Sequence, residues 1–248
     1  AAASDVYKRQ IITVSQQDWN MLYARFDEIQ NESVMSIYSD AAIRLRTMVE
    51  VAEILSQKYD IVVTNPPYMK ADNMSPKLAA YVETYKSSAK YDLYAAFIYR
   101  CHEWIKFNGF MSIITMHNYM FAPSFLEMRN EIKNWSWVNM VHLGSRAFSE
   151  ISGEVVQTVA YTISKRTIKT LFSVIDVTEE KAAEGKEEKF LERKQKPYVF
   201  DLQDLDYMPG HAFGYSLSDV VVNLYKENAF LSKHGISTVS YTHLRAHE

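Results

Sequence analysis

Residues 60–68 read DIVVTNPPY, and the predicted class of fold depends on them more than on any other segment. The first half of this stretch is a short run of apolar, mostly β-branched residues, which is typical of a strand buried on both faces within a parallel sheet. Pro66 and Pro67 have no backbone N–H group to donate, so the strand has to end where they begin. The sequence therefore predicts a buried strand that leads directly into Asn65 and the two prolines.

The segments on either side of this strand alternate in their expected secondary structure. Apolar residues recur at helical spacing in two segments before it, and strand-like and helical runs alternate after it. We expect helices over 18–30, 40–56 and 92–107, a helix that begins at Pro123, and strands over 60–64, 110–115, 137–143, 155–163 and 170–177. This alternation is typical of an α/β fold with a parallel sheet.

The chain is expected to contain six consecutive segments. Both ends resemble translated sequencing-adapter sequence, so we set them aside as tails and predict that the chain is an internal fragment. Residues 178–196 carry charges of both signs and few aromatic side chains, which indicates a solvated linker. The expected segments are a tail (1–10), a helical lead-in (11–57), the sheet domain that carries Asn65 (58–177), a charged linker (178–197), the start of a second unit (198–238) and a tail (239–248).

Composition excludes several classes of protein. The chain is 48% hydrophobic and 23% charged, and it contains no run of about 18 apolar residues that would predict a membrane span. Cys101 is the only cysteine, which excludes an internal disulfide and a multi-cysteine zinc site and fits a reducing cytoplasm. No histidine cluster has metal-ligand spacing, so we expect no bound metal. The net charge of −3 weakly disfavours a nucleic-acid surface.

Asn65, Pro66, Pro67 and Tyr68 form a candidate catalytic site. Ligands of an open α/β sheet bind where loops leave the carboxyl ends of the strands, and this segment occupies such a position. The side-chain oxygen of Asn65 and the carbonyl of Pro66 could accept the two N–H groups of a planar conjugated amine and stabilise its developing positive charge. The prolines fix that carbonyl, and the ring of Tyr68 could stack on a flipped-out base. The alternative is a strand-ending turn without chemistry.

A few other residues are candidates for the substrate side of this site. Pro67 belongs to the same turn, and His117 and Asn118 follow a predicted strand at its carboxyl end, so we count all three as candidate substrate-binding residues. Asp92 is expected to be a helix N-cap rather than a substrate contact. Two aromatic residues could form a second wall of a base pocket, although a place in the hydrophobic core is the preferred interpretation: Phe121 and Phe148.

The stretch at 60–68 resembles the catalytic motif of adenine-N6 DNA methyltransferases. The sequences DLYAAF at 92–97 and GFMSIIT at 109–115 are similar to the helix and strand that follow this motif in that family. The sequence of these segments is most similar to that of the adenine methyltransferases of BREX-type phage-defence systems, the PglX family. The resemblance covers about 55–165 well and 201–218, which contains MPG at 208–210, faintly.

The resemblance implies a fold and an activity. It implies the C-terminal part of a Rossmann-like sheet that uses S-adenosylmethionine, and methylation of a flipped adenine in double-stranded DNA by Asn65, Pro66 and Tyr68. The methylation would mark host DNA, and other phage-defence proteins are the implied partners. In this class a glycine-rich cofactor loop and a ribose-binding acid precede the catalytic strand. Residues 11–59 contain no glycine, so we expect the cofactor-binding residues upstream of this chain.

Two other functions remain open. An amino methyltransferase with the same tetrapeptide could act on a protein glutamine or on an RNA guanine, because each presents a planar conjugated amine. A non-catalytic specificity module could retain the fold. The long segment after residue 177 favours a DNA-reading extension over the first alternative, and the intact Asn65 and Tyr68 argue against the second.

Overall fold

The computed structural model describes residues 14–31, 36–147, 156–166 and 170–227. The chain divides into two compact units, residues 1–57 and 58–248, so the division falls where the predicted helical lead-in ends. Both adapter-like tails lie outside the described residues. Within the described ranges, no helix combines the length and the apolar composition needed to cross a membrane.

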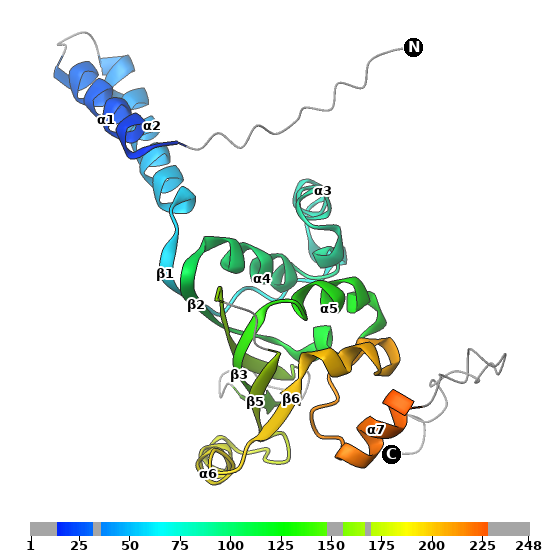
Figure 1. Ribbon diagram of the computed structural model, residues 1–248. Coiled ribbons are helices and arrows are strands. Elements are labelled where there is room, and N and C mark those ends of the chain that lie inside the picture. The colour runs from blue at the N-terminus through cyan, green and yellow to red at the C-terminus, as the bar shows by residue number, and fades with distance from the viewer. Residues whose placement is uncertain (1–13, 32–35, 148–155, 167–169, 228–248) are drawn as a thin grey trace, which may run out of the picture. The chain divides into compact units, whose positions relative to one another are not determined.

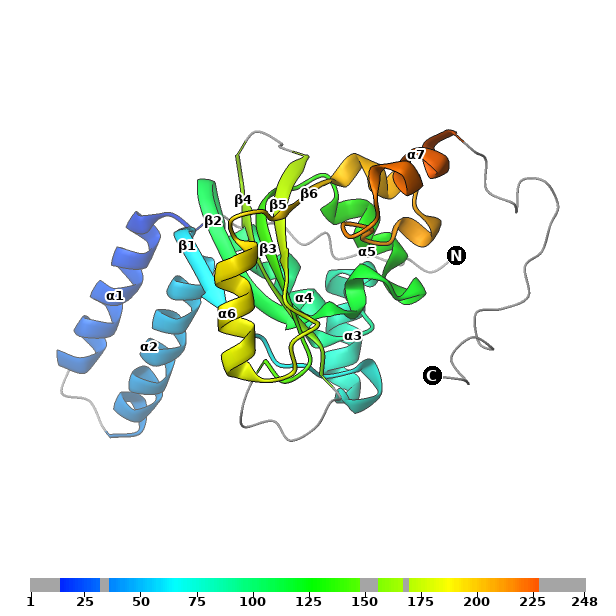
Figure 2. The ribbon, with the colours of Figure 1, turned by 90° about the horizontal axis from the view of Figure 1, so that it is seen from below.

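The first unit is a pair of helices. α1 (Gln16–Asn31) and α2 (Ser36–Ser56) confirm the two predicted lead-in helices and lie side by side (Figures 1 and 2). Trp19 and Phe26 are buried. The Tyr23 hydroxyl donates a hydrogen bond of 2.6 Å to the carboxylate of Glu53, which joins the two helices.

The second unit contains a six-stranded mixed sheet in the order β1-β2-β4-β3-β5-β6. β1, β2, β3 and β5 run parallel to one another, whereas β4 and β6 are antiparallel to their neighbours. The carboxyl ends of four strands therefore meet at one edge of the sheet. The strands are β1 (Tyr59–Thr64), β2 (Ile105–Met116), β3 (Ser136–Gly144), β4 (Thr158–Ser164), β5 (Leu171–Asp176) and β6 (Tyr198–Asp201).

Helices cover both faces of this sheet. α3, α4 and α5 lie on one face and α6 lies on the other (Figures 1 and 2). The α-helices are α3 (Pro76–Tyr85), α4 (Leu93–Trp104), α5 (Leu126–Ile132), α6 (Ala183–Arg193) and α7 (Asp219–Glu227). Short 3-10 helices are η1 (Ala71–Asn73), η2 (Ser87–Ala89), η3 (His117–Met120), η4 (Pro123–Phe125), η5 (Leu202–Asp206) and η6 (Pro209–His211). The predicted α/β fold is confirmed, but the sheet is mixed and not purely parallel.

β1 differs from the prediction in its burial. It is parallel to β2, as expected, but the side chains of Ile61 and Val63 are 66% and 72% exposed. Val62, which points the other way, packs against the core that α4 covers. β1 pairs with only one strand among those described and lies at the edge of the sheet. The expectation of a strand buried on both faces is therefore wrong for one face.

The helix predicted over 92–107 ends three residues earlier. α4 stops at Trp104, and Ile105 takes an extended conformation and pairs with Tyr59 at the start of β2. Gly109 allows the backbone of β1 to lie close to β2, because a Cβ atom at this position would lie 2.9 Å from the carbonyl oxygen of Asp60.

The predicted linker and second unit also need correction. Much of 178–197 forms α6, and β6 then pairs with β5 in the same sheet. Phe200 and Leu205 are buried in the same core as the other strands. Residues 198–227 therefore continue the sheet unit, because the open edge of β5 offers backbone partners to β6 and its core accepts these apolar side chains.

Arg129 explains why the Met208-Pro209-Gly210 segment packs against this unit. The side chain is completely buried on α5. Its guanidinium donates to the carbonyls of Tyr119 at 2.8 Å, of Ala122 at 2.7 Å and of Gly210 at 2.6 and 3.0 Å. Burial lowers the pKa of Arg129 to about 10. A buried cation satisfied by three carbonyls thus joins residues 81 positions apart in the sequence.

Candidate active site

The segment Asn65-Pro66-Pro67-Tyr68 leaves the sheet at the carboxyl end of β1. Asn65 and Pro67 are exposed, Pro66 is buried and Tyr68 is partly buried. The buried proline fixes the backbone from one side, since its ring sets φ and it has no N–H group that needs a partner. The exposed Asn65 side chain is therefore presented at the sheet edge where ligands of α/β folds bind.

Tyr68 orients the side chain of Asn65. The Tyr68 hydroxyl lies 3.1 Å from the Asn65 side-chain oxygen, to which it donates, and 3.4 Å from the carbonyl oxygen of Ile114 on β2. Its ring meets that of Tyr94 edge-on, with centroids 6.1 Å apart. Burial raises the pKa of Tyr68 to about 12, so the phenol is neutral and remains a donor at neutral pH.

Asp92 attaches this loop to the first turn of α4. Its carboxylate caps α4 by accepting from the backbone N–H of Tyr94 at 3.4 Å, so the predicted N-cap is confirmed. The same oxygen accepts from the N–H of Met69 at 2.9 Å, directly after Tyr68. The N–H of Leu93 donates back to the Met69 carbonyl at 2.9 Å. Asp92 thus positions the candidate catalytic loop in addition to capping a helix, a role that its sequence context did not indicate.

His117 and Asn118 lie at the carboxyl end of β2, in η3. The Nδ1 atom of His117 lies 2.8 Å from Nε2 of His142, and its ring meets that of Phe121 edge-on at 5.5 Å. The carbonyl of Asn118 accepts from the N–H groups of the turn that follows. Among the described residues, no hydrogen bond joins either side chain to Asn65, so their substrate-binding role remains a prediction.

Phe121 and Phe148 are the two aromatic residues that could form a second wall of a base pocket. Phe121 is 42% exposed beside His117, which does not agree with the preferred core interpretation. Phe148 lies outside the described residues. Cys101 is buried within the core.

A chain of polar side chains runs along the carboxyl edge of the sheet beyond His117. Nδ1 of His142 on β3 lies 2.5 Å from the hydroxyl of Tyr215, which donates to the carboxylate of Asp176 on β5 at 2.8 Å. None of these three residues was predicted from the sequence. His142 and Asp176 stand near the carboxyl ends of two predicted strands, so the rule that singled out His117 could have found them. Tyr215 gives no such signal.

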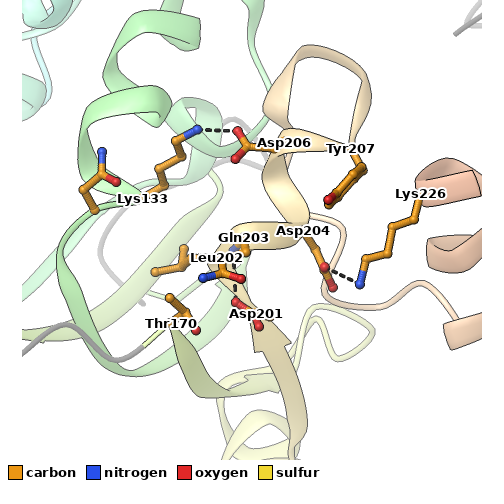
Figure 3. A pocket seen from close by; sticks show the side chains of 10 residues that line it. Lys133, Thr170, Asp201, Leu202, Gln203, Asp204, Asp206, Tyr207 and Lys226 are labelled. Carbon is orange, nitrogen blue, oxygen red and sulfur yellow. Dashed lines mark hydrogen bonds and ion pairs between the residues drawn. The ribbon is translucent and has the colours of Figure 1, made fainter. Parts of the chain in front are cut away.

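The pocket in Figure 3 lies at the opposite edge of the sheet. It has a volume of about 600 Å³ and opens beside the amino ends of β3 and β5, near Asn134 and Thr170. Two ion pairs bridge its lining, Lys133 with Asp206 and Lys226 with Asp204. Four of its five charged side chains are thus paired with one another, the fifth, Asp201, accepts from the backbone N–H of Gln203, and Asn65 is not among its lining residues.

No metal cluster appears in the part of the chain that the structure describes. Within those residues, no three His, Cys, Asp or Glu side chains gather closely enough to hold an ion.

The fold and the site together define the class of α/β methyltransferases. The chain belongs to the Eco57I restriction-modification methylase family, whose model matches residues 2–148. The adenine-specific methyltransferase PglX of Lacticaseibacillus casei (strain Zhang) is 36% identical over 195 residues, which are 75% of this chain and 16% of that protein. The adenine-specific methyltransferase BrxX of Escherichia coli O9:H4 (strain HS) is 36% identical over 156 residues, 62% of this chain and 13% of that protein.

Solved structures agree with this fold. A nuclease-deletion mutant of the Type ISP restriction-modification enzyme LlaGI in complex with a DNA substrate mimic aligns over 80% of this chain and 18% of its own, with a TM-score of 0.54 and 13% identity. The DrdV-DNA complex aligns over 68% of this chain and 19% of its own, with a TM-score of 0.50 and 15% identity. This chain spans less than a fifth of the length of the two curated relatives.

The methyl donor of this class is S-adenosylmethionine. The exposed carboxyl end of β1, with Asn65 presented there, fits the amine side of a methyl transfer. Residues 11–59 before β1 contain no glycine, so the chain carries no glycine-rich loop there that could cradle the donor. We therefore assign no residue of this chain to the cofactor.

Proposed function

We propose that this chain is the catalytic part of a longer DNA methyltransferase that transfers a methyl group from S-adenosylmethionine to N6 of adenine. The observation that carries the proposal is the exposed Asn65 side chain, held by the Tyr68 hydroxyl at the open carboxyl end of β1. The names of the two curated relatives support adenine as the substrate, and both relatives are much longer than this chain.

The amine of adenine is a poor nucleophile because its lone pair is delocalised into the ring. The Asn65 side-chain oxygen has two lone pairs, and the Tyr68 hydroxyl occupies one of them. The other lone pair, together with the Pro66 carbonyl, accepts the two N–H groups of the amine. These acceptors stabilise the positive charge that develops on nitrogen, and they are preorganised because Pro66 and Tyr68 hold them in place.

S-adenosylmethionine supplies an electrophilic methyl group when it is bound. The partly exposed ring of Tyr68 offers a surface on which a flipped adenine can stack. The substrate in this proposal is double-stranded DNA with the target adenine turned out of the helix. The enzyme acts in the cytoplasm, where the methyl group marks host DNA alongside other phage-defence proteins.

The decisive experiment replaces Asn65 by alanine in the chain joined to its natural flanking sequence. Tritiated methyl transfer to duplex DNA should fall about 100-fold or more, since the loss of one acceptor in a preorganised site costs roughly 3 kcal/mol. DNA affinity should be unchanged, because the interaction acts on the chemical step. Asn134→Ala is the matched control, as this exposed asparagine lies at the opposite edge of the sheet and should keep normal turnover.

The same assay separates the alternatives. Parallel reactions receive structured RNA and a glutamine-containing protein extract in place of DNA. Transfer to either of these, with none to DNA, would overturn adenine in DNA as the substrate but keep the amine chemistry. Near-normal transfer to DNA by Asn65→Ala would contradict the methyltransferase mechanism itself.

A further inference from the structure

The polar chain along the carboxyl edge has a defined direction. Burial alone would raise the pKa of Asp176, but hydrogen bonds from Thr178 and Tyr215 outweigh it and leave the pKa below its ordinary value. Asp176 is therefore a carboxylate that can only accept, and the Tyr215 hydroxyl donates to it. The oxygen of Tyr215 then accepts the proton that faces it, which is the one on Nδ1 of His142.

The tautomers of both imidazole rings follow from these hydrogen bonds. Burial lowers the pKa of His142 to about 4 and also lowers that of His117, so both rings are neutral at neutral pH. A neutral ring with its proton on Nδ1 has a bare Nε2. Nε2 of His142 therefore accepts from Nδ1 of His117 over 2.8 Å. The remaining nitrogen, Nε2 of His117, carries a lone pair and has no hydrogen-bond partner among the described residues.

His117 stands at the same sheet edge as the candidate catalytic loop. His117 directly follows β2, and the carbonyl of Ile114 on that strand lies 3.4 Å from the Tyr68 hydroxyl. Methyl transfer leaves the amine nitrogen with two protons, a methyl group and a positive charge, so one proton has to depart. Asn65 and Pro66 offer only amide oxygens, which do not hold a proton at neutral pH, and the Tyr68 phenol is already protonated.

We propose that His117 is the proton acceptor of the reaction and that His142, Tyr215 and Asp176 are positioning residues that hold its Nε2 lone pair ready. This proposal rests on the function proposed above. The N–H bond of the methylated amine breaks, its electron pair returns to nitrogen, and a new N–H bond forms at Nε2 of His117. The charged ring then donates its Nδ1 proton more strongly to His142. An arylammonium nitrogen is a strong acid, so even a histidine of lowered pKa accepts its proton.

The tautomers can be measured without any activity. Long-range proton–nitrogen NMR of the histidine rings should show a protonated Nδ1 and a bare Nε2 at both His117 and His142. Asp176→Asn places an amide N–H where the carboxylate accepts, so Tyr215 should donate to His142 and both tautomers should invert. Asp219→Asn on exposed α7 is the matched control and should change neither ring. A protonated Nε2 on His117 in the unaltered protein would overturn the proposal, whatever the variants do.

The catalytic role is tested by chemical rescue in the chain with its natural flanks. His117→Ala should lower kcat about 100-fold, at the lower end of what a general base contributes, and leave the KM for DNA unchanged. Added imidazole should restore the rate in proportion to its concentration, which a structural defect would not allow. Tyr215→Phe should lower kcat to a smaller extent, whereas Tyr81→Phe, an exposed tyrosine, should not.

Two results would reject the acceptor role. One is an unchanged kcat in His117→Ala, and the other is a loss that imidazole does not reverse. Failure of the proposed function is recognised separately, because the unaltered enzyme would then transfer no methyl group to DNA while the tautomer measurement stands by itself.

Discussion

The hydroxyl of Tyr68 donates a hydrogen bond of 3.1 Å to the side-chain oxygen of Asn65. In this arrangement the side-chain oxygen of Asn65 accepts from the hydroxyl, whose other acceptor within reach is the Ile114 carbonyl at 3.4 Å. The bond to Asn65 leaves one lone pair of its side-chain oxygen for a substrate. Tyr68 is thus a positioning residue for Asn65 as well as a candidate stacking surface, and the two roles can be separated by mutation.

Tyr68→Phe keeps the ring and removes only the hydrogen bond. We expect methyl transfer to fall between about twofold and tenfold, since a neutral hydrogen bond contributes roughly 0.5–1.5 kcal/mol. Tyr68→Ala should be slower still and should also weaken capture of the flipped base, because stacking contributes roughly 1–3 kcal/mol per base. Tritiated methyl transfer and 2-aminopurine fluorescence at the target position measure the two effects. Full base flipping by Tyr68→Ala would remove the stacking role and leave the role toward Asn65 intact.

Asp92→Ala should destabilise the second unit and displace the candidate catalytic loop. The substitution removes an N-cap, which costs about 1 kcal/mol, and leaves the Met69 N–H without its acceptor at 2.9 Å. We expect a loss of about 2–3 kcal/mol in urea unfolding. Asp92→Asn retains an acceptor oxygen in the same place and should lose less than half as much. Equal losses for the two variants would show that the charge of Asp92, and not its acceptor geometry, matters.

Arg129→Met should be among the most destabilising single substitutions in this chain. The methionine fills much of the volume but leaves the carbonyls of Tyr119, Ala122 and Gly210 without their donors. Removing one partner of a buried charged network typically costs about 3–5 kcal/mol. Lys77→Met, at an exposed lysine on α3 of the same unit, should change stability by less than about 0.5 kcal/mol in the same urea titration. A loss near 1 kcal/mol at Arg129 would mean that the segment around Gly210 is held by other contacts.

The stability of the second unit should fall in mild acid because of His102. Burial, with a contribution from Lys165, lowers the pKa of His102 to about 4. His102 binds a proton below about pH 6.5 in the unfolded chain but only near pH 4 in the folded chain. Its contribution to the free energy of unfolding is therefore fully present above pH 6.5 and is lost as the pH falls from 6.5 to 4. For a fully buried ring the free energy of unfolding would fall by about 3 kcal/mol. The fall should be smaller here because the ring is partly exposed.

His102→Phe isolates this contribution. The imidazole stacks on Trp135 with centroids 3.9 Å apart, and a phenyl ring can keep that contact. We expect the variant to lose less stability between pH 7 and pH 5 than the unaltered protein, as measured by melting temperature. Part of the loss of stability with falling pH should remain, because the pKa of His142 is also lowered to about 4. Parallel pH curves for the two proteins would exclude His102 as a source of the acid sensitivity.

Elements that depend on local backbone chemistry can be recognised from the amino-acid sequence alone. The two prolines end β1 because they have no N–H group, and Asp92 caps α4 because a carboxylate satisfies the free N–H groups of a first turn. Both rules act over a few residues, so they can be recognised in a single chain. The strand pattern in the sequence also placed Asn65 and His117 at the carboxyl ends of two predicted strands.

How distant segments complete the site and the core became apparent only from the folded chain. The sequence did not indicate that β4 runs antiparallel between β2 and β3, or that β6 extends the sheet beyond the predicted linker. Nor did it pair His142 with Tyr215, 73 residues later, or Arg129 with Gly210, 81 residues later. Such pairings follow from which edges and faces remain open after the local elements have formed. That choice is made by burial and hydrogen bonding across the whole unit, and no short stretch of sequence encodes it.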